Sequence, residues 1–450
     1  MQTLAIDVGS SAVKAAVLEG TSVVGRVARE SFATRYVGHI AEVEPAEILR
    51  AVKAAVARLP AARADVLALA VMSPCVTLAD AEGRGLVPFI THQDRRSLAA
   101  ARAVEADIGP DRFLQTVGCR CTPGGIAASS LRHLRENQPE AYAQAAAGGW
   151  VLPLSSYLVM HLCGAPAVDP SNAGFLGLAD VRLAGAAVAD PDPDPWHPDL
   201  LASVLGEGPR PGLPPVVTAD RPAGTLQKKV AGAWGLKHGL PVLPGIIDGS
   251  CPLLLGTGPR PGKLANAAGS SDVLAMVLPE ARPTPGLLMR PLGVGGLFVA
   301  AATMAAAGSA MNWARETWFC DHTPQTFARL VADAAATPFD GPAVHFEPAL
   351  AGDRLAVEQP TASLTGMTLA TTRRDLARAL AAALARSSRD RLDRLLALAD
   401  AEGIALSRDV LLTGMAGGTL VDVLHRDWPG GFGFTYEDEA TLRGLGALTN

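Results

Sequence analysis

The sequence predicts an α/β protein made of two similarly built halves, and three observations support this fold class. Apolar runs of strand length alternate with segments of helical periodicity along the chain. Residues 9–19 (GSSAVKAAVLE) align without a gap with the segment that begins GSSDVLAMVL at residue 269. A length of 450 residues suits two or three domains. The match indicates two copies of one glycine-serine hairpin turn, although chance similarity between two short apolar strands is the alternative.

The composition is that of an ordinary soluble globular enzyme. Charged residues make up 18% of the chain and the formal net charge is -5. This charge gives no sign of a basic surface that would bind nucleic acid. The first residues begin directly as a strand and lack the pattern of a secretory signal. Residues 141–168 carry no charged side chain, but proline, glycine and serine interrupt them, so we expect core rather than a membrane span. Six scattered cysteines predict free thiols in a reducing cytoplasm and no zinc site.

The first half begins with a hairpin around the turn Gly9–Ser11. In order, we expect strands at 3–8, 12–18, 22–30 and 66–71 and helices at 46–58, 126–147, 157–162 and 200–205. The glycine turn lets backbone N–H groups meet phosphate oxygens without obstruction by side chains. Asp7 ends the first strand, where a carboxylate can hold hydrated Mg²⁺ or simply cap the turn. Lys14 is either a phosphate ligand or a solvated strand lysine.

Polar segments later in the first half are candidate sugar contacts. Ser73 lies in the turn that follows strand 66–71. Asp94 and Arg96 follow another strand, where such a pair can bind sugar hydroxyls, although a solvated or structural ion pair is its more frequent use. Residues 169–172 (DPSN) have turn chemistry and are expected to lead into a strand.

The chemistry of the chain is centred on residues 245–278. An apolar strand ends in Asp248, and after a glycine- and proline-rich turn the loop 268–271 (AGSS) leads into a second apolar strand. An acid at a strand end can accept a proton from an attacking hydroxyl, and the glycine-serine turn can bind phosphate oxygens, as phosphoryl transfer requires. We place the main domain boundary near residues 240–245, which gives domains 1–242 and 243–450.

The second half continues with a helix at 298–318, a long amphipathic helix or helix pair at 373–401, a strand at 409–412 and a helix at 420–427. Between the last two lies the glycine turn 413–419. A strand, a glycine turn and a helix N-terminus suit the approach of a negatively charged ligand. A tight strand–helix turn without a ligand is the alternative.

The ordered set of motifs resembles the FGGY carbohydrate kinase family of the actin-like ATPase superfamily, and its xylulokinase-like branch most closely. AIDVGSSAVKAAVLEG resembles the first phosphate motif of the family, with Asp7, Gly9 and Lys14 in place and Ser10 where threonine is usual. The other matching segments are TLADAEGRGLVPFITHQDRRS, AVDPSNAGFLGLAD, LPGIIDGSCPLLLGTG, AAGSSDVLAMV, AAAGSAMNW and LLTGMAGGTLV. Together they cover nearly the whole chain.

This resemblance implies two actin-like ATPase (ribonuclease H-like) domains around a deep cleft. It implies a kinase that uses ATP and Mg²⁺ to phosphorylate a primary hydroxyl of a sugar or polyol, with a ketose such as xylulose as the first expectation. Asp248 would be the general base and Asp7 the metal-holding residue. The implied nucleotide-binding residues are Gly9, Ser10, Ser11, Lys14, Gly269, Ser270, Ser271, Gly308, Asn312, Gly414, Met415 and Ala416. The implied substrate-binding residues are Ser73, Asp94, Arg96, Asp248 and Gly249.

We therefore expect a cytoplasmic enzyme whose partner is a small molecule, with no nucleic acid or membrane partner. The oligomeric state stays open, a homodimer being one option. Three departures from the family pattern are Met415 in place of glycine, Gly249 in place of a polar residue, and residues 72–75. They motivate the alternative of a non-catalytic or regulatory member that binds sugar or nucleotide. A dinucleotide oxidoreductase is disfavoured, because no G-x-G-x-x-G joins the first strand to a helix.

Overall fold

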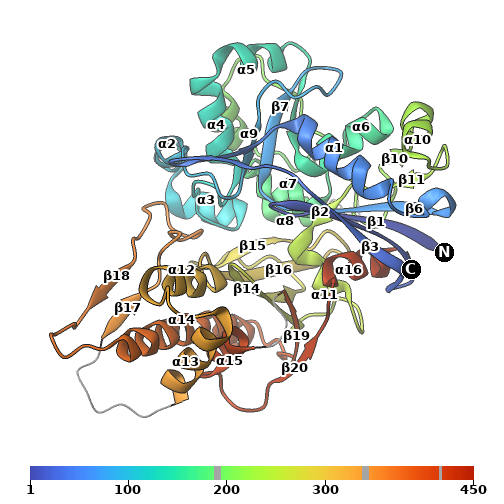
Figure 1. The fold of residues 1–450 in the computed structure, drawn as a ribbon. Coiled ribbons are helices and arrows are strands. Elements are labelled where there is room, and N and C mark those ends of the chain that lie inside the picture. Colours follow the sequence, from blue (N-terminus) through green and yellow to red (C-terminus); the bar gives the residue numbers. More distant parts are fainter. Residues whose placement is uncertain (187–193, 337–343, 415–417, 450) are drawn as a thin grey trace. The chain divides into compact units, whose positions relative to one another are not determined.

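The structure is a computed structural model that describes residues 1–186, 194–336, 344–414 and 418–449 (Figure 1). The chain forms two compact units. The first unit contains residues 1–260, 277–299 and 439–450, and the second contains residues 261–276 and 300–438. No helix among the described residues is long and apolar enough to cross a membrane.

The main sheet of the first unit has the strand order β10-β11-β6-β1-β2-β3, and β12 also pairs with β6. Its strands are β1 (Gln2–Val8), β2 (Ala12–Glu19), β3 (Ser22–Ser31), β6 (Val66–Val71), β10 (Gly224–Thr225), β11 (Pro241–Val242) and β12 (Ile246–Ile247). β1 is antiparallel to β2 and parallel to β6. The β1–β2 register places Asp7 directly opposite Lys14.

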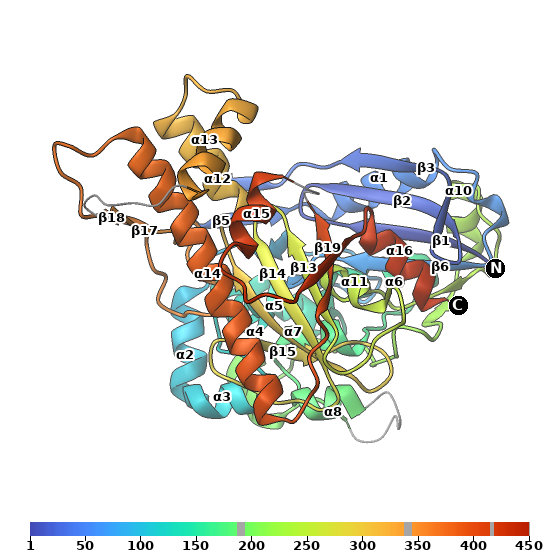
Figure 2. The same cartoon turned by 90° about the horizontal axis from the view of Figure 1, so that it is seen from below.

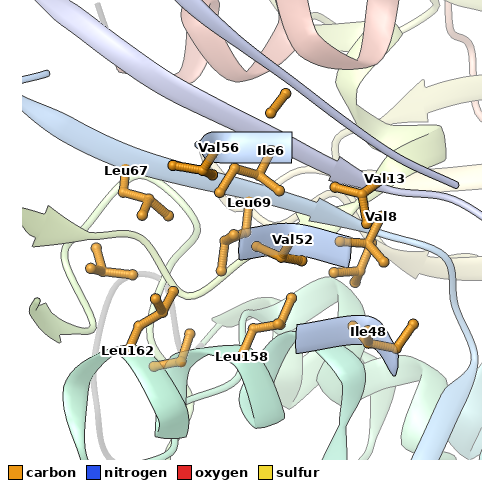
Figure 3. Packing of buried hydrophobic residues seen from close by; sticks show 14 of the residues in the cluster. Ile6, Val8, Val13, Ile48, Val52, Val56, Leu67, Leu69, Leu158 and Leu162 are labelled. Atoms are coloured by element: carbon orange, nitrogen blue, oxygen red, sulfur yellow. The ribbon is translucent and has the colours of Figure 1, made fainter. Parts of the chain in front are cut away.

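Apolar side chains from this sheet pack against two helices, α1 (Pro45–Val56) and α6 (Leu154–Cys163). Figure 3 shows Ile48, Val52 and Val56 on α1, spaced at helical intervals. Leu158 and Leu162 of α6 lie in the same buried cluster. This packing fixes the end of β1, and therefore Asp7, on a rigid sheet.

A second sheet of the first unit has the order β4-β5-β8-β7-β9. Its strands are β4 (Arg35–Val37), β5 (Ile40–Val43), β7 (Cys75–Ala79), β8 (Phe89–Thr91) and β9 (Trp150–Pro153). The other elements of this unit are α2 (Leu98–Ile108), α3 (Pro110–Val117), α4 (Ala127–Asn137), α5 (Pro139–Ala146), α7 (Pro170–Leu176), α8 (Val181–Ala186), α9 (Pro198–Leu205), α10 (Lys228–Trp234), α11 (Cys251–Leu254), β15 (Leu288–Pro291), α16 (Ala440–Leu448) and the 3₁₀ turns Ala61–Arg63 and Asp248–Ser250.

The compact units differ from two consecutive halves that meet near residue 242. Strand β12 pairs with Ala70–Val71 of β6, which keeps Asp248 in the first unit. The last helix, α16, packs on β1, β2 and β6, so the end of the chain also belongs to the first unit.

The second unit repeats the local arrangement of the first. The hairpin β13–β14 is antiparallel, and β13 also pairs in parallel with β19, as β1 does with β6. Its elements are β13 (Leu264–Ala268), α12 (Gly308–Trp318), α13 (Pro324–Ala336), β17 (His345–Glu347), β18 (Ser363–Thr365), α14 (Arg373–Ala401), β19 (Asp409–Gly414), α15 (Thr419–His425) and β20 (Gly433–Tyr436). Strands β14 (Asp272–Leu278) and β16 (Phe298–Met304) carry the chain across the division between the units. In Figures 1 and 2, α13 and α15 lie beside the long helix α14.

The structure corrects three predictions about elements. Residues 170–176 form helix α7 rather than a strand, because Asp169 caps its N-terminus and Pro170 suits the first helical position. Residues 298–304 form strand β16 and only 308–318 are helical, so sheet pairing overrides the helical preference of the alanines. The helix expected at 126–147 is two helices, α4 and α5, divided before Pro139.

Candidate active site

Asp7, at the end of β1, is a buried carboxyl whose environment disfavours its charged form. The residue is 8% exposed, and its Oδ1 atom has no hydrogen-bond partner among the residues that the structure describes. Burial, and next the negative charge of Asp248, raise the pKa of Asp7 to about 7, while Lys14 acts in the opposite direction. A buried carboxylate oxygen without a partner is costly unless a cation or a proton meets it.

Asp7 therefore fits a hard cation such as Mg²⁺. No group of three or more acidic, histidine or cysteine side chains that could hold a metal occurs in the described part of the chain. Mg²⁺ needs no such group, because it keeps several waters and is commonly held by one or two carboxylates together with substrate phosphates. The orphaned oxygen of Asp7 matches this mode of binding.

Lys14, the predicted phosphate ligand, is held by a residue that sequence reasoning missed. Its Nζ lies 2.6 Å from Oε2 of Glu439, the residue before α16, and Arg29 lies 3.8 Å from the same carboxylate. Glu439 has a φ of 44°, and it is the one non-glycine residue with positive φ in the described ranges. Such a strained backbone is kept only where its surroundings hold it. A phosphate would have to compete with Glu439 for Lys14.

Asp248 follows β12 and begins the 3₁₀ turn Asp248–Ser250. It is partly exposed, and its Oδ1 accepts a hydrogen bond of 2.6 Å from the backbone N–H of Gly249. The backbone N–H of Ile247 lies 3.3 Å from Oγ of Ser171, on the capped helix α7. This contact ties the strand that precedes Asp248 to the buried start of α7, where Asp169 accepts from the backbone N–H groups of Ser171 and Asn172.

A buried arginine, Arg290 on β15, supports the turn that contains Asp248. The residue is 6% exposed, and Nη1 donates to Oγ of Ser250 at 2.6 Å and to the carbonyl of Pro291 at 3.2 Å. Its Nη2 lies 3.9 Å from the position that a Cβ on Gly249 would occupy. Burial lowers the pKa of Arg290 to about 10, and the charges of Asp169 and Asp248 oppose this effect. Sequence reasoning missed Arg290, because only the fold brings it to this turn.

Both copies of the Gly-Ser-Ser repeat form hairpin turns, one in each unit. In the second unit, the carbonyl of Gly269 accepts from the N–H of Gly308, and the carbonyl of Ser270 accepts from Ala307 and Ser309. Because a trans peptide directs its N–H opposite to its carbonyl, the N–H groups of Ser270 and Ser271 point away from α12. Ser270 is exposed, so these N–H groups can meet an anion.

A cavity of about 250 Å³ lies beside α12 in the second unit. Its lining includes Gly308, Asn312, Arg315, Phe327, Thr419 and Leu420. Gly308 and Asn312 were predicted nucleotide contacts, and the remaining lining adds apolar surface and a guanidinium. Apolar walls with a few polar groups are typical of small-molecule sites. Gly414 precedes this region in β19, while Met415 and Ala416 lie outside the described residues.

The predicted sugar contacts Asp94 and Arg96 already have partners within the protein. Asp94 is 1% exposed and accepts from the backbone N–H groups of Ala41 and Arg96. Arg96 lies 2.7 Å from Asp94 and 2.7 Å from Glu42. This geometry favours a structural ion pair, the alternative to sugar binding. Ser73 is partly exposed after β6, and its role and that of Gly249 stay predictions.

Comparison with known proteins identifies the class to which this chain belongs. The N-terminal domain of the FGGY family of carbohydrate kinases matches residues 2–254, and the C-terminal domain of that family matches residues 264–417. The chain belongs to the FGGY family of carbohydrate kinases.

Particular relatives agree with this assignment. The chain is 28% identical to L-fuculokinase of Salmonella typhi over 66% of its own length and 58% of that protein. It is 26% identical to L-xylulose/3-keto-L-gulonate kinase of Escherichia coli (strain K12), over 71% of its own length and 60% of the relative. It therefore spans less than two thirds of the length of these curated relatives.

Solved structures show the same fold. The xylulose kinase from Rhodospirillum rubrum superposes with a TM-score of 0.82 at 24% identity, covering 99% of this chain and 88% of the other. The gluconate kinase from Lactobacillus acidophilus gives a TM-score of 0.83 at 16% identity, covering 100% and 89%. The protein thus has the α/β, two-domain actin-like ATPase fold expected from its sequence.

Proposed function

We propose that the protein is an ATP-dependent carbohydrate kinase that phosphorylates a primary hydroxyl of a sugar or polyol, with Asp248 as general base. One observation carries the proposal: the orphaned carboxylate of Asp7 and the partly exposed carboxylate of Asp248 end two strands, β1 and β12, that both pair with the last residues of β6. Membership of a kinase family supports the reaction class. Strongly perturbed carboxyls at the end of a strand are typical of functional sites.

In the proposed reaction, the substrate hydroxyl loses its proton to an Asp248 carboxylate oxygen as its own oxygen bonds to the γ-phosphorus. The bond between that phosphorus and the bridging oxygen breaks, and ADP leaves with the electron pair. Asp7 would hold Mg²⁺, which when bound supplies positive charge to the phosphate oxygens. Lys14 and the N–H groups of Ser270 and Ser271 would donate to phosphate oxygens. A positioned base of this kind contributes about 10²–10⁴-fold in rate.

For the nucleotide, we propose that the α12 cavity accepts the base and ribose of ATP. Gly308 and Asn312 line it, and its volume of about 250 Å³ is of the order that a small ligand requires. For the acceptor, we propose a ketose such as xylulose as the first candidate, acted on in the cytoplasm. Relatives and structural neighbours of the chain include kinases of 3-keto-L-gulonate, gluconate and glycerol, so these compounds belong in any test.

The test is ADP release from Mg-ATP across a panel of pentuloses, hexuloses, acidic sugars and polyols. The proposal predicts ADP release that depends on one class of acceptor. ADP binding without turnover on any acceptor would favour the alternative, a non-catalytic member that binds nucleotide. The ion pair between Lys14 and Glu439, which a bound phosphate would have to break, is the observation that motivates this test.

A further inference from the structure

A set of buried polar side chains lies directly beneath the turn Gly269–Ser271 of the second unit. Asn266 on β13 donates through Nδ2 to Oδ1 of Asp272 at 2.6 Å and to the carbonyl of Val273 at 3.1 Å. Arg391 on α14 places Nη2 2.5 Å from Oδ2 of Asp272, and its Nη1 donates to the backbone carbonyl of Asp272 at 3.1 Å. The side chains of Asp272 and Arg391 are 1% and 4% exposed.

His425, at the end of α15, extends this set. Its Nε2 lies 2.9 Å from Oδ1 of Asn266. Because the amide nitrogen of Asn266 donates to Asp272, its oxygen is an acceptor, which assigns the proton to Nε2 of His425. The ring stacks on Phe434 at 4.3 Å between centroids, and burial lowers the pKa of His425 to about 4, so the imidazole stays neutral.

These contacts fix both ends of the turn. Asp272 pairs with Ala268 in the last register position of the β13–β14 hairpin, so Arg391 holds the residue at which the turn ends. Ala268 pairs in turn with Gly414 of β19. A Cβ on Gly414 would lie 2.2 Å from the carbonyl oxygen of Ala268, so this close approach requires glycine.

The same side chains connect the turn to the cavity. Helix α15 begins with Thr419 and Leu420, which line the cavity, and ends with His425, which contacts Asn266. The backbone N–H groups at the start of α12 donate to the carbonyls of Gly269 and Ser270, and Asn312 further along this helix lines the cavity. The turn and the cavity are therefore linked through two helices.

We propose that Asn266, Asp272, Arg391 and His425 are positioning residues that hold the Gly269–Ser271 turn in register with the cavity, so that one nucleotide can engage both. The inference rests on the proposed function, because it concerns the binding of ATP. A buried ion pair is a poor source of stability, since apolar residues of similar volume are often as stable or more so. Arg391 instead contacts both the side chain and the backbone carbonyl of Asp272, and this geometry suits placement of the turn.

The test distinguishes an effect on the position of the turn from an effect on the stability of the protein. The variants are Arg391→Met, Asp272→Leu and the double variant that combines them, with Arg389→Met as the control. Arg389 lies on the same helix, pairs with Asp393 on the surface and donates to the carbonyl of Asp427, which follows α15. ADP affinity is measured by titration calorimetry with Mg²⁺, and unfolding is followed in urea. KM for ATP and for the best acceptor is measured in parallel.

We expect both single variants to be less stable and the double variant to recover most of the loss. ADP should nevertheless bind about tenfold or more weakly to the double variant, the loss expected when one charge-assisted hydrogen bond to phosphate is misplaced. KM for the acceptor should not change, and Arg389→Met should match the wild type. His425→Phe should weaken ADP binding more than His425→Gln, which keeps an N–H donor.

A double variant that binds ADP as tightly as the wild type would overturn the inference and leave the proposed kinase function intact. Equal increases in KM for ATP and for the acceptor would also overturn it, because a general loosening of the fold would explain them. Failure of the wild-type protein to bind ADP would instead overturn the proposed function and this inference together.

Discussion

Removing the carboxylate of Asp7 should stabilise the protein at the expense of its activity. The pKa of this buried carboxyl is about 7 in the folded protein, against 3.8 for an ordinary aspartate. The folded state therefore binds the proton more tightly than the unfolded state, and its stability falls as pH rises from about 4 to about 7. A pKa difference of this size corresponds to about 4 kcal/mol above pH 7.

The perturbation is Asp7→Asn, which cannot ionise. In urea unfolding without divalent metal, the variant should exceed the wild type by about 4 kcal/mol at pH 8 and by about 2 kcal/mol at pH 5. Asp199→Asn is the matched control, because Asp199 lies on the surface of α9 and pairs with Arg112. It should change stability by less than about 1 kcal/mol at both pH values.

Two results would refute this reasoning. A variant no more stable than the wild type at pH 8 would show that Asp7 is not the costly buried charge that its surroundings indicate. A gain of equal size at both pH values would show that packing, and not ionisation, sets the difference. Loss of phosphoryl transfer together with the stability gain is the signature of a group kept for function.

Three further predictions concern neighbouring residues. Arg290→Gln should reduce kcat more than Arg290→Lys, because lysine keeps a positive charge beside Ser250, and equal losses in kinase assays would count against an electrostatic role. Glu439→Gln should lower KM for ATP, because it removes the charge that competes with phosphate for Lys14; an unchanged or higher KM would contradict this. Asn312→Leu should raise KM for ATP and leave KM for the acceptor unchanged, whereas equal changes would count against Asn312 as a nucleotide contact.

Much of the fold could be predicted from the sequence, because its signals are local. The period of apolar residues predicted β6 and, at residues 373–401, a long helix or a helix pair; the structure has the single helix α14 over Arg373–Ala401. Glycine and serine between apolar strands predicted both hairpin turns. The DPSN segment was misread because Asp-Pro serves equally as a turn and as a helix start.

The supporting residues of the candidate site could not be predicted in the same way. Lys14 and Glu439 are 425 positions apart, and Asp272 and the helix residue Arg391 are 119 positions apart. No periodicity or turn chemistry connects such positions, and a positive φ at Glu439 leaves no mark on the sequence. Arg290 appears in the sequence as a single charge in a short apolar strand, and only the fold places it behind the Asp248 turn.

The central claim, that Asp248 removes the proton from the attacking hydroxyl, is tested most directly by following the γ-phosphoryl group itself. Wild type and Asp248→Asn are incubated with Mg-ATP and the best acceptor, and ³¹P NMR records the sugar phosphomonoester. We predict that the wild type forms this product and that Asp248→Asn forms it about 10²–10⁴-fold more slowly while binding ADP equally well. Product formation by Asp248→Asn at the wild-type rate would contradict the assignment.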